Sequence, residues 1–459
     1  MTSLMPQLRE IVGPQGLIAD PSTETRYHGD WSTHQKCAPL AVVRPANTLE
    51  VAQVLAVCHQ ARQPVVVQGG LTGLSGGATP ARHELALSLE RLNGIEDLDT
   101  QSMTMTVGAG TPLEVIQHAA EDAGFRFPLD LGARGSCNIG GNIATNAGGN
   151  QVIRYGMTRN LVLGLETVLA DGTVISSLNR MLKNNAGYDL KHLFIGSEGT
   201  LGVVTRAVLR LFPRLGNKCT AMCGVDSFTS VVDLLHLLGK KFGGELNTFE
   251  VMWANYFDHM LANLPGARSP FADDQYPLYA LIEIETADEA DGMSRLEVCL
   301  ADALETGVLQ DVALAQSLRE AEGFWAIRDG VSDIPNLLTE TAAFDVSVPL
   351  NVMESFVADV DSSLDNRFAD YSNLVFGHIG DNNLHLLVAT GDKSDYQAIN
   401  DTVYAVVGDY RGSVSAEHGI GLIRKNYLMY SRTPEEIELM QRLKSTLDPN
   451  NILNPGRIF

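Results

Sequence analysis

Apolar and polar positions in the first half of the chain follow two patterns, short apolar runs and longer stretches with apolar residues at helical spacing. The short runs predict strands, and they cover residues 39–45, 64–67, 85–89, 103–110, 161–170 and 173–177. Residues 48–62 and 112–124 predict amphipathic helices, and Asn47 or Thr48 is a suitable N-cap for the first of them. Residues 1–30 predict a helical lead-in. This mixture favours an α+β or α/β fold with glycine-rich loops.

The second half of the chain has a different pattern, in which longer strands alternate with helices that have polar faces. The strands are expected at residues 279–286, 344–350, 373–380 and 384–390, and they predict an antiparallel sheet covered by helices. Residues 433–449 predict a last helix, because Pro434 stands in its first turn with carboxylates behind it. Glycine-rich loops become fewer after about residue 215. We therefore expect one domain at 1–215, a second at 216–415 and a C-terminal segment at 416–459.

Composition and charge limit the kinds of molecule that the protein is expected to bind. The chain has 459 residues, of which 45% are hydrophobic and 19% charged, as in a soluble globular protein. This length exceeds one ordinary core, so two or three domains are expected. Lys and Arg number 33 against 55 Asp and Glu, which gives a net charge of −22. Such a surface repels nucleic acid and anionic lipid, and an anionic substrate would need a local cationic site.

The cysteines, at positions 37, 58, 137, 219, 223 and 299, form no C-x-x-C pair. Their spacing excludes zinc-ribbon, thioredoxin-like and cysteine-ligated cluster sites. The chain also lacks a run of about 18 apolar residues that could span a membrane. Its first ten residues, MTSLMPQLRE, lack the basic and apolar regions of a secretory signal. A cytoplasmic protein with reduced thiols is therefore expected.

The densest glycine-rich stretch is Gln68 to Gly77, QGGLTGLSGG, in which five of ten residues are glycine. It directly follows the apolar run at 64–67. Glycine has no Cβ and tolerates a positive φ, so backbone N–H groups in such a loop can converge on an anion. A plain surface loop is the alternative, and it explains the glycine density less well. We interpret the stretch as the site of a diphosphate.

Two more glycine-rich blocks, at 131–149 and 194–205, suggest that one extended ligand lies across several loops. A complete G-x-G-x-x-G that opens a helix is absent, and so is G-x-x-x-x-G-K-[ST]. Rossmann-type and Walker-type nucleotide sites are therefore disfavoured. The pattern favours a different dinucleotide fold, in which loop amides hold the diphosphate without a helix dipole.

These three blocks resemble the FAD-binding half of the vanillyl-alcohol-oxidase/PCMH flavoprotein superfamily. QGGLTGLSGG, IGGNIATNAGG (139–149) and GSEGTLGVVT (196–205) match it in order and spacing. The resemblance implies a PCMH-type domain that binds FAD without a covalent bond. It places the diphosphate on Gln68, Gly69, Gly70, Leu71, Thr72, Gly73, Leu74 and Gly76. It places the ribityl chain and isoalloxazine beside Pro128, Asp130, Ser136, Gly141, Asn142, Thr145, Gly148 and Gly149. It places the adenine half beside Gly199, Gly202 and Val204, with Asn454 closing over the flavin from the C-terminal segment.

A second set of polar residues lies far along the chain. The stretch GHIGDNNLH contains His378 and His385, and SAEHGIG contains Glu417 and His418. A hairpin could aim both imidazoles of the first stretch at one point, with Glu417 entering from a separate strand. Two histidines and a carboxylate with open positions suit Zn²⁺ or Mn²⁺. Histidines with a purely structural role are the alternative.

This half of the chain resembles the C-terminal domain of FAD-linked D-2-hydroxy-acid dehydrogenases, which include D-lactate, glycolate and D-2-hydroxyglutarate dehydrogenases. The resemblance implies that His378, His385 and Glu417 hold a divalent metal and that His418 takes the hydroxyl proton. It also implies that Asn383 lies near both flavin and metal. Arg328 in FWAIRDGVSD is our candidate for the cationic group that binds the substrate carboxylate, since a guanidinium matches a carboxylate with two hydrogen bonds. A surface or structural arginine is the alternative.

The sequence leaves the substrate open. Gln68 resembles the hydroxyglutarate branch, but Ala343 and Leu387 stand where that branch has a lysine and an asparagine. This leaves D-lactate or a larger apolar 2-hydroxy acid as further substrates. The main hypothesis is oxidation of a D-2-hydroxy acid to the 2-oxo acid, with electrons passed to an acceptor protein or a quinone and with a homodimer as one assembly. The alternatives are a flavin-binding subunit that is inactive outside a multi-chain redox complex, and an aryl-alcohol or sugar oxidase that needs no metal.

Overall fold

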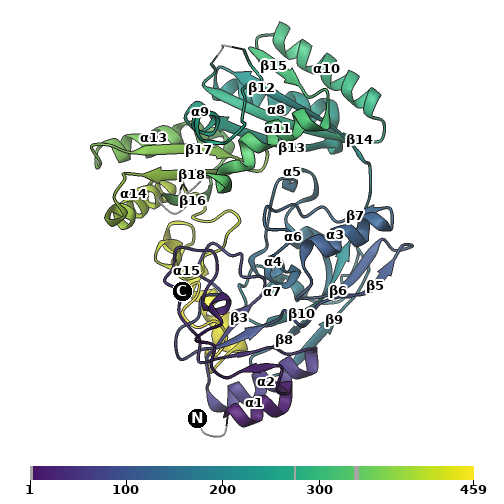
Figure 1. The fold of residues 1–459 in the computed structure, drawn as a ribbon, viewed down its shortest axis with the longest axis vertical. Coiled ribbons are helices and arrows are strands. Elements are labelled where there is room, and N and C mark those ends of the chain that lie inside the picture. The colour runs from purple at the N-terminus through teal and green to yellow at the C-terminus, as the bar shows by residue number, and fades with distance from the viewer. Residues whose placement is uncertain (1–3, 273–274, 335–336, 338–340) are drawn as a thin grey trace. The chain divides into compact units, whose positions relative to one another are not determined.

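The computed structural model describes residues 4–272, 275–334, 337 and 341–459. The chain divides into two compact units (Figure 1). Unit 1 consists of residues 1–149, 155–214 and 417–459, and unit 2 consists of residues 150–154 and 215–416. Each unit therefore contains stretches that are distant in sequence.

The N-terminal part of unit 1 is built on a four-stranded sheet. Its strands, in spatial order, are β1 (Leu17–Ile18), β2 (Ala41–Val43), β4 (Leu85–Ser88) and β3 (Val65–Gln68). Strands β2, β4 and β3 are parallel, and helix α2 (Thr48–Ala61) connects β2 to β3. The Asn47 side chain caps this helix by accepting a hydrogen bond from the N–H of Glu50 at 3.0 Å. The expected N-cap is confirmed at Asn47.

A second sheet of unit 1 is antiparallel and has five strands. In spatial order they are β5 (Ile95–Asp99), β6 (Thr104–Gly108), β10 (Val203–Arg210), β8 (Val162–Val168) and β9 (Val174–Ser177). The other elements of unit 1 are α1 (Leu4–Val12), α3 (Leu113–Asp122), α4 (Ile139–Thr145), α6 (Thr158–Leu161), α7 (Lys191–Phe194) and the pair β7 (Phe125–Arg126) and β11 (Phe212–Pro213). Helix α5 (Val152–Tyr155) lies mostly within the residues of unit 2. Strand β5 was not predicted, because its sequence IEDLD contains three carboxylates among five residues and lies at a partly exposed edge of the sheet.

The predicted helical lead-in is wrong beyond residue 12. Helix α1 ends at Val12, and Gly13 has a φ of +71°. The chain then forms the short strand β1 and a single 3-10 turn at Thr25–His28. Glycine tolerates this backbone conformation and Pro14 cannot continue the helix, so the helix ends there.

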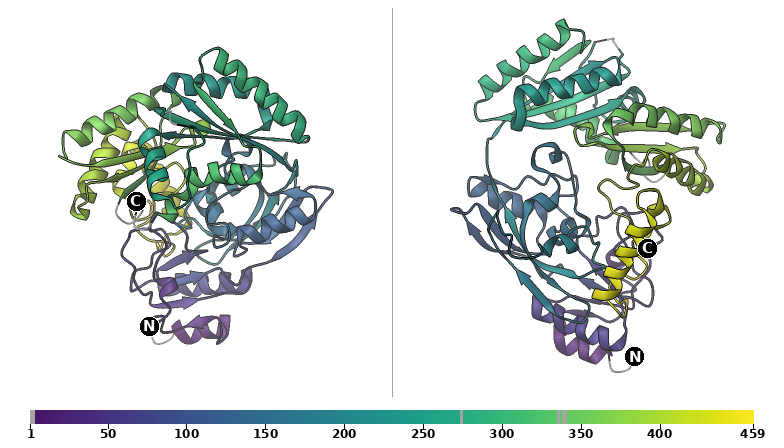
Figure 2. Two further views of the ribbon diagram at one scale, coloured as in Figure 1. Left: turned by 45° about the horizontal axis from the view of Figure 1, so that its top comes forward. Right: turned by 180° about the vertical axis from the view of Figure 1, so that it is seen from behind.

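The C-terminal segment returns to the first sheet of unit 1, as Figure 2 shows with the yellow chain beside the N-terminal part. Helix α15 (Pro434–Leu447) begins with Pro434 in its first turn, as its sequence predicts, and a capping box between Thr433 and Glu436 closes this end. Beyond it, Leu453 pairs with Val65 of β3 as a parallel bridge. The tail therefore runs along the strand that leads into the first glycine-rich loop.

Unit 2 contains a seven-stranded sheet in which all the neighbouring strands are antiparallel. In spatial order the strands are β15 (Asp311–Leu314), β12 (Asn217–Val225), β14 (Leu278–Thr286), β13 (Leu246–Trp253), β17 (Ser372–Gly377), β18 (Asn383–Ala389) and β16 (Ala342–Ser347). Its helices are α8 (Phe228–Phe242), α9 (Ala254–Asn263), α10 (Glu289–Glu305), α11 (Leu318–Asp329), α13 (Met353–Asp365) and α14 (Tyr396–Asp409). Every residue of β14 is buried, so both faces of the sheet are covered there. The α+β expectation and the antiparallel sheet are confirmed.

Among the residues that the structure describes, none of the helices has both the length and the apolar character needed to cross a membrane.

Candidate active site

The first glycine-rich loop begins where β3 ends, at Gln68. The Gln68 side chain closes the loop by donating to the carbonyl oxygens of Tyr27 and Ala78, at 2.9 and 3.0 Å. Within the described part of the chain, the backbone N–H groups of residues 69–76 donate to no protein acceptor. Leu71 and Gly76 have φ angles of +61° and +76°. A run of N–H groups without protein acceptors in a turn of this kind suits an anion such as a diphosphate.

The first and second glycine-rich blocks lie against each other. A Cβ on Gly70 would stand 2.1 Å from the carbonyl oxygen of Ser136, and one on Gly69 would stand 3.5 Å from the Cα of Gly141. By contrast, a Cβ on Gly141 would meet no protein atom within 4 Å. The buried Oδ1 of Asn142 has no hydrogen-bond partner in the described part of the chain. Space beside Gly141 and an unsatisfied buried acceptor next to it fit a bound flavin.

The second block is not loop throughout, contrary to our expectation, because residues 139–145 form α4. Of the flavin candidates in this block, Thr145 donates back to the Gly141 carbonyl oxygen at 3.2 Å, and Ser136 is exposed. Upstream of it, Pro128 is buried and Asp130 forms an ion pair with Arg134 at 3.1 Å. The backbone of Asp130 also touches this block, since a Cβ on Gly149 would stand 2.0 Å from its carbonyl oxygen.

We predict that Gly141→Ala removes flavin without unfolding the protein. The new methyl group would enter space that no protein atom fills, and alanine stabilises a helix by about 0.5–1 kcal/mol relative to glycine. The measurement is flavin absorbance per chain together with the melting temperature. Gly239→Ala in α8 is the matched control, because it is also a helical glycine with no atom within 4 Å. Full flavin content in Gly141→Ala would contradict this placement of the cofactor.

In the third block, protein packing accounts for the glycines. A Cβ on Gly202 would stand 2.8 Å from Thr167 and 2.9 Å from the ring of Phe194. Val204 is buried on β10. A Cβ on Gly199 would stand 3.0 Å from the side-chain nitrogen of Asn454. The placement of these residues beside the adenine half stays a prediction.

Asn454 joins the C-terminal tail to two parts of unit 1. Its Oδ1 accepts a hydrogen bond from the N–H of Val67 at 2.8 Å, and its Nδ2 donates to the carbonyl oxygen of Glu198 at 2.6 Å. The side chain is buried. Asn454 thus holds together the strand before the first glycine-rich loop and the third block.

Glu198 was not singled out from the sequence, yet it holds the loop that follows His418. Its carboxylate accepts hydrogen bonds from the N–H groups of Ile420 and Gly421, at 2.7 and 2.8 Å. A Cβ on Gly419 would stand 2.8 Å from the same carboxylate. Burial raises the pKa of Glu198, although both backbone hydrogen bonds oppose this shift. The sequence signal that could have identified Glu198 is a glutamate within the glycine-rich motif GSEGTLG.

In unit 2, the β17–β18 hairpin brings His378 and His385 together, as the sequence predicts. His378 directly follows β17, and His385 is in β18, paired with Phe376. The two ring centroids are 5.3 Å apart with planes at 79°. His378 is only 5% exposed, while His385 is half-buried.

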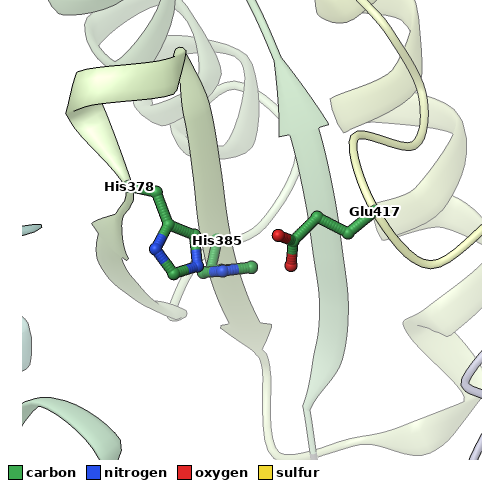
Figure 3. Close-up of side chains that lie close together, drawn as sticks. All are labelled: His378, His385 and Glu417. Atoms are coloured by element: carbon green, nitrogen blue, oxygen red, sulfur yellow. The ribbon is translucent and has the colours of Figure 1, made fainter. Parts of the chain in front are cut away.

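Glu417 is not in a strand, which corrects our expectation. It lies in a bend directly after Ala416, the last residue of unit 2, whose N–H donates to the carbonyl oxygen of Asp345 in β16 at 3.1 Å. In Figure 3 its carboxylate points toward both imidazoles, and one ligand atom from each of the three residues lies within 4.8 Å of the others. Its Oε1 also accepts a hydrogen bond from the N–H of Gly149 at 2.7 Å, and a Cβ on Gly148 would overlap it. Two imidazoles and a carboxylate at this spacing fit Zn²⁺ or Mn²⁺.

Arg328 donates hydrogen bonds to two carboxylates of the protein. It lies near the end of α11 and is 6% exposed. Its Nε donates to Glu250 Oε2 at 2.9 Å, and its Nη1 donates to Asp329 at 3.1 Å. Its Nη2 also lies 2.8 Å from the same oxygen of Glu250, and the role of Arg328 as the partner of a substrate carboxylate stays a prediction.

Glu250, in β13, is the functional candidate that sequence reasoning missed. Its Oε1 lies 2.7 Å from Nδ1 of His378. Burial alone would raise the pKa of the Glu250 carboxyl, but the charges of His378 and Arg328 outweigh it and lower this pKa to about 2. A glutamate inside the apolar strand sequence LNTFEVMW was the only local signal.

Asn383 begins β18 and is buried. Its Nδ2 donates to Asp345 Oδ1 at 2.7 Å, which fixes the orientation of the amide. Its Oδ1 has no hydrogen-bond partner in the described residues. Asn383 therefore keeps one acceptor available two residues before His385.

Leu387 lies on the same face of β18 as His385, because side chains alternate along a strand. It is 3% exposed and belongs to an apolar cluster with Leu374 and Phe376. Ala343, paired with it across the sheet, is exposed. This face of the sheet is therefore apolar next to His385.

Two family models match successive parts of the chain. The family model described as FAD binding domain matches residues 39–177, and the one described as FAD linked oxidases, C-terminal domain, matches residues 215–458. The D-2-hydroxyglutarate dehydrogenase of Xanthomonas citri pv. viticola is 39% identical over 98% of this chain and 96% of its own. The mitochondrial D-2-hydroxyglutarate dehydrogenase of Arabidopsis thaliana is 38% identical over 98% of this chain and 80% of its own. A Schizosaccharomyces pombe protein named as a mitochondrial D-lactate dehydrogenase is 34% identical over 97% and 88%.

Solved structures show the same fold at low sequence identity. p-Cresol methylhydroxylase with substrate bound aligns with a TM-score of 0.76 and 14% identity, over 100% of this chain and 96% of the other. Alkyldihydroxyacetonephosphate synthase aligns with a TM-score of 0.76 and 18% identity, over 99% and 86%. The fold is therefore of the PCMH type.

Proposed function

The chain belongs to the family of FAD-linked oxidases and is an FAD-dependent D-2-hydroxy-acid dehydrogenase, and on that premise we propose how its residues divide the reaction. The family match and the relatives' names support the activity. The observation that carries the division of roles is the hairpin that gathers His378 and His385, with Glu417 next to them. The reaction removes a hydride from the substrate Cα and a proton from its hydroxyl.

FAD supplies the hydride acceptor when it is bound. The chain's part is to hold it with the N–H groups of residues 69–76 and with the space beside Gly141. We assign this task to the domain at 1–215, the substrate to residues 216–415, and completion of the site to 416–459.

His378, His385 and Glu417 would hold a Zn²⁺ or Mn²⁺ ion, which would bind the substrate's hydroxyl and carboxylate and lower the hydroxyl pKa. His418 takes the hydroxyl proton as general base. The Oδ1 of Asn383 is an acceptor for a polar hydrogen of the substrate. Arg328 contributes positive charge near His378, with its Nη2 3.2 Å from Nε2 of that residue.

The substrate class is a D-2-hydroxy acid with D-2-hydroxyglutarate and D-lactate as the two leading members. The relatives' names support both. Leu387 within an apolar cluster supports acids with a short or apolar side chain. An apolar pocket distinguishes homologous acids by only about 1–3 kcal/mol per methylene, so several acids are expected to react.

We predict that D-2-hydroxy acids bleach the flavin when oxygen is absent and that the matching L-acids do not. The measurement is flavin absorbance over a panel that contains D-lactate, D-2-hydroxyglutarate and longer apolar D-2-hydroxy acids, with and without added Zn²⁺ or Mn²⁺. The ratio of reduction rates for D-2-hydroxyglutarate and the apolar acids ranks the substrates. If no D-acid reduces the flavin, the proposed activity is wrong.

Two alternative functions predict different results in turnover assays. A flavin-binding subunit that is inactive alone would show no turnover of an artificial dye by the isolated chain. An aryl-alcohol or sugar oxidase would keep its activity in the presence of a chelator. The proposal also includes an acceptor protein or a quinone as the electron acceptor, a homodimer and a cytoplasmic location. Size exclusion and fractionation test the last two, and some eukaryotic relatives carry mitochondrial names.

A further inference from the structure

The loop at residues 417–423, which carries His418, is attached to the glycine-rich blocks of unit 1 at both of its ends. The carboxylate of its first residue accepts a hydrogen bond from the N–H of Gly149 in the second block, at 2.7 Å. Near its other end, the N–H of Leu422 donates to the carbonyl oxygen of Ser75 in the first block, at 3.0 Å. The loop and the three blocks all belong to unit 1. The expected base is therefore carried by the same compact unit as the loops assigned to FAD.

Glu198 attaches the middle of this loop to the third block. Its Oε1 accepts a hydrogen bond from the N–H of Ile420 at 2.7 Å, and its Oε2 accepts one from the N–H of Gly421 at 2.8 Å. A Cβ on Gly419 would stand 2.8 Å from Oε1, so the carboxylate lies directly against the backbone that follows His418. A carboxylate can hold both N–H groups at once, because each of its oxygens is an acceptor.

The backbone of Glu198 is itself held in place on both sides. Its N–H donates to the carbonyl oxygen of Ala144 at 2.8 Å, and its carbonyl oxygen accepts a hydrogen bond from Nδ2 of Asn454 at 2.6 Å. Its φ is +50°, a conformation that is uncommon for residues other than glycine and that persists where the surroundings impose it. The side chain is buried. Glu198 is therefore a fixed point to which the loop is attached.

We propose that Glu198 is a positioning residue for His418, because it holds the backbone after the imidazole at a set place against the blocks assigned to FAD. The inference rests on the proposed function, since it assumes that His418 takes the hydroxyl proton. In this role Glu198 acts through the loop and takes no part in the chemistry itself. A base must lie within hydrogen-bond reach of the proton that it removes, so a small shift of the loop slows the reaction.

The first test is anaerobic reduction of the flavin by a D-2-hydroxy acid in Glu198→Gln, expressed per bound flavin. A glutamine amide has one acceptor oxygen and one donor nitrogen, so one of the two backbone N–H groups would face another donor. We expect reduction to be about 10–100-fold slower, since a misplacement of about 1 Å can cost about 10²-fold. The substrate concentration at half the maximal rate should stay near that of the wild type, because the variant displaces the base and removes no substrate contact.

A double variant shows whether the effect passes through His418. In the His418→Ala background the base is already absent, so the addition of Glu198→Gln should not slow flavin reduction further. Two losses that multiply would show that Glu198 acts on a different group and would overturn the inference.

Amide hydrogen exchange of the peptide that contains residues 419–423 gives a readout that does not need turnover. We expect exchange there to be about fivefold faster in Glu198→Gln, because one N–H group has lost its acceptor. Unchanged exchange would overturn the inference even if flavin reduction were slow, because the effect would then not come through the loop.

Glu166→Gln is the matched control. Glu166 is also buried in unit 1, in β8, where it accepts hydrogen bonds from the hydroxyl groups of Thr48 and Thr205, at 2.6 and 3.0 Å. This variant should keep the wild-type rate of reduction per flavin and the wild-type exchange of residues 419–423. An equal loss in Glu166→Gln would show a general effect of removing a buried carboxylate and would contradict a specific role for Glu198.

The same measurements separate this inference from the proposed function. Wild-type reduction in Glu198→Gln, with slow reduction in His418→Ala, would overturn the inference alone. Wild-type reduction in His418→Ala would remove the base from the proposed function, and the inference would fail with it. Should Glu198→Gln not fold, Glu198→Asp decides the matter. Its shorter carboxylate cannot reach both N–H groups from the same backbone position, so a wild-type rate there would contradict the positioning role.

Discussion

Replacing His418 by alanine is expected to lower turnover by about 10²–10⁴-fold while the flavin stays bound, because a general base contributes a factor of this size. The backbone of the loop that follows His418 is held by a carboxylate from another part of the chain. Ile420 and Gly421 are held through their N–H groups by Glu198, 222 and 223 residues away in sequence. The variant should therefore keep the loop, the flavin and the fold.

The measurement for His418→Ala is dye-linked turnover together with flavin absorbance and metal content. Loss of a base used only in the transition state lowers kcat and kcat/KM equally, whereas loss of a substrate contact raises KM. His236→Ala, an exposed histidine of α8, is the control for histidine removal in general. Near-normal turnover in His418→Ala would remove this residue as the base.

Replacing His378 by alanine is expected to remove bound metal and activity together and to leave the flavin in place. The imidazole is one of three expected ligands, and its loss leaves two. It also leaves the Oε1 of the buried Glu250 without its 2.7 Å partner, which costs about 1–3 kcal/mol. A lower melting temperature should therefore accompany the loss of metal.

Elemental analysis of the purified variant tests this prediction, with turnover measured before and after Zn²⁺ or Mn²⁺ is added. His236→Ala again serves as the control and should keep its metal. A His378→Ala chain with full metal content would show that the cation, if present, is held elsewhere. A chain without metal but with full activity would favour a reaction that needs no cation.

Local patterns in the sequence predicted most elements that border the site. The strand at 64–67 became β3, and the helix at 433–449 became α15 with the expected start. The hairpin that carries His378 and His385 also formed where the alternating pattern placed it. These features depend on neighbours a few residues apart, so side-chain periodicity and capping residues carry the information.

Other features depended on contacts that a local pattern does not contain. Helix α4, inside the second glycine-rich block, is short and contains two glycines. Glycine is unfavourable in helices, so the sequence did not predict this helix. The bend that carries Glu417 follows from a hydrogen bond between Ala416 and Asp345, 71 positions apart in the numbering of the chain. Asn454 likewise links the tail to Val67, 387 residues away.

The sequence by itself determined the family, the α+β fold and the positions of the strands that carry the histidines. Each of these can be recognised from short sequence motifs or from the periodicity of apolar residues. Only the tertiary structure decided the partners of those residues. Glu250 contacts Arg328 and His378, which lie 78 and 128 residues away in the sequence. The sequence of its own strand does not predict either contact. Burial creates this pairing, since a carboxylate withdrawn from water is stable only where the fold supplies positive charge and hydrogen-bond donors.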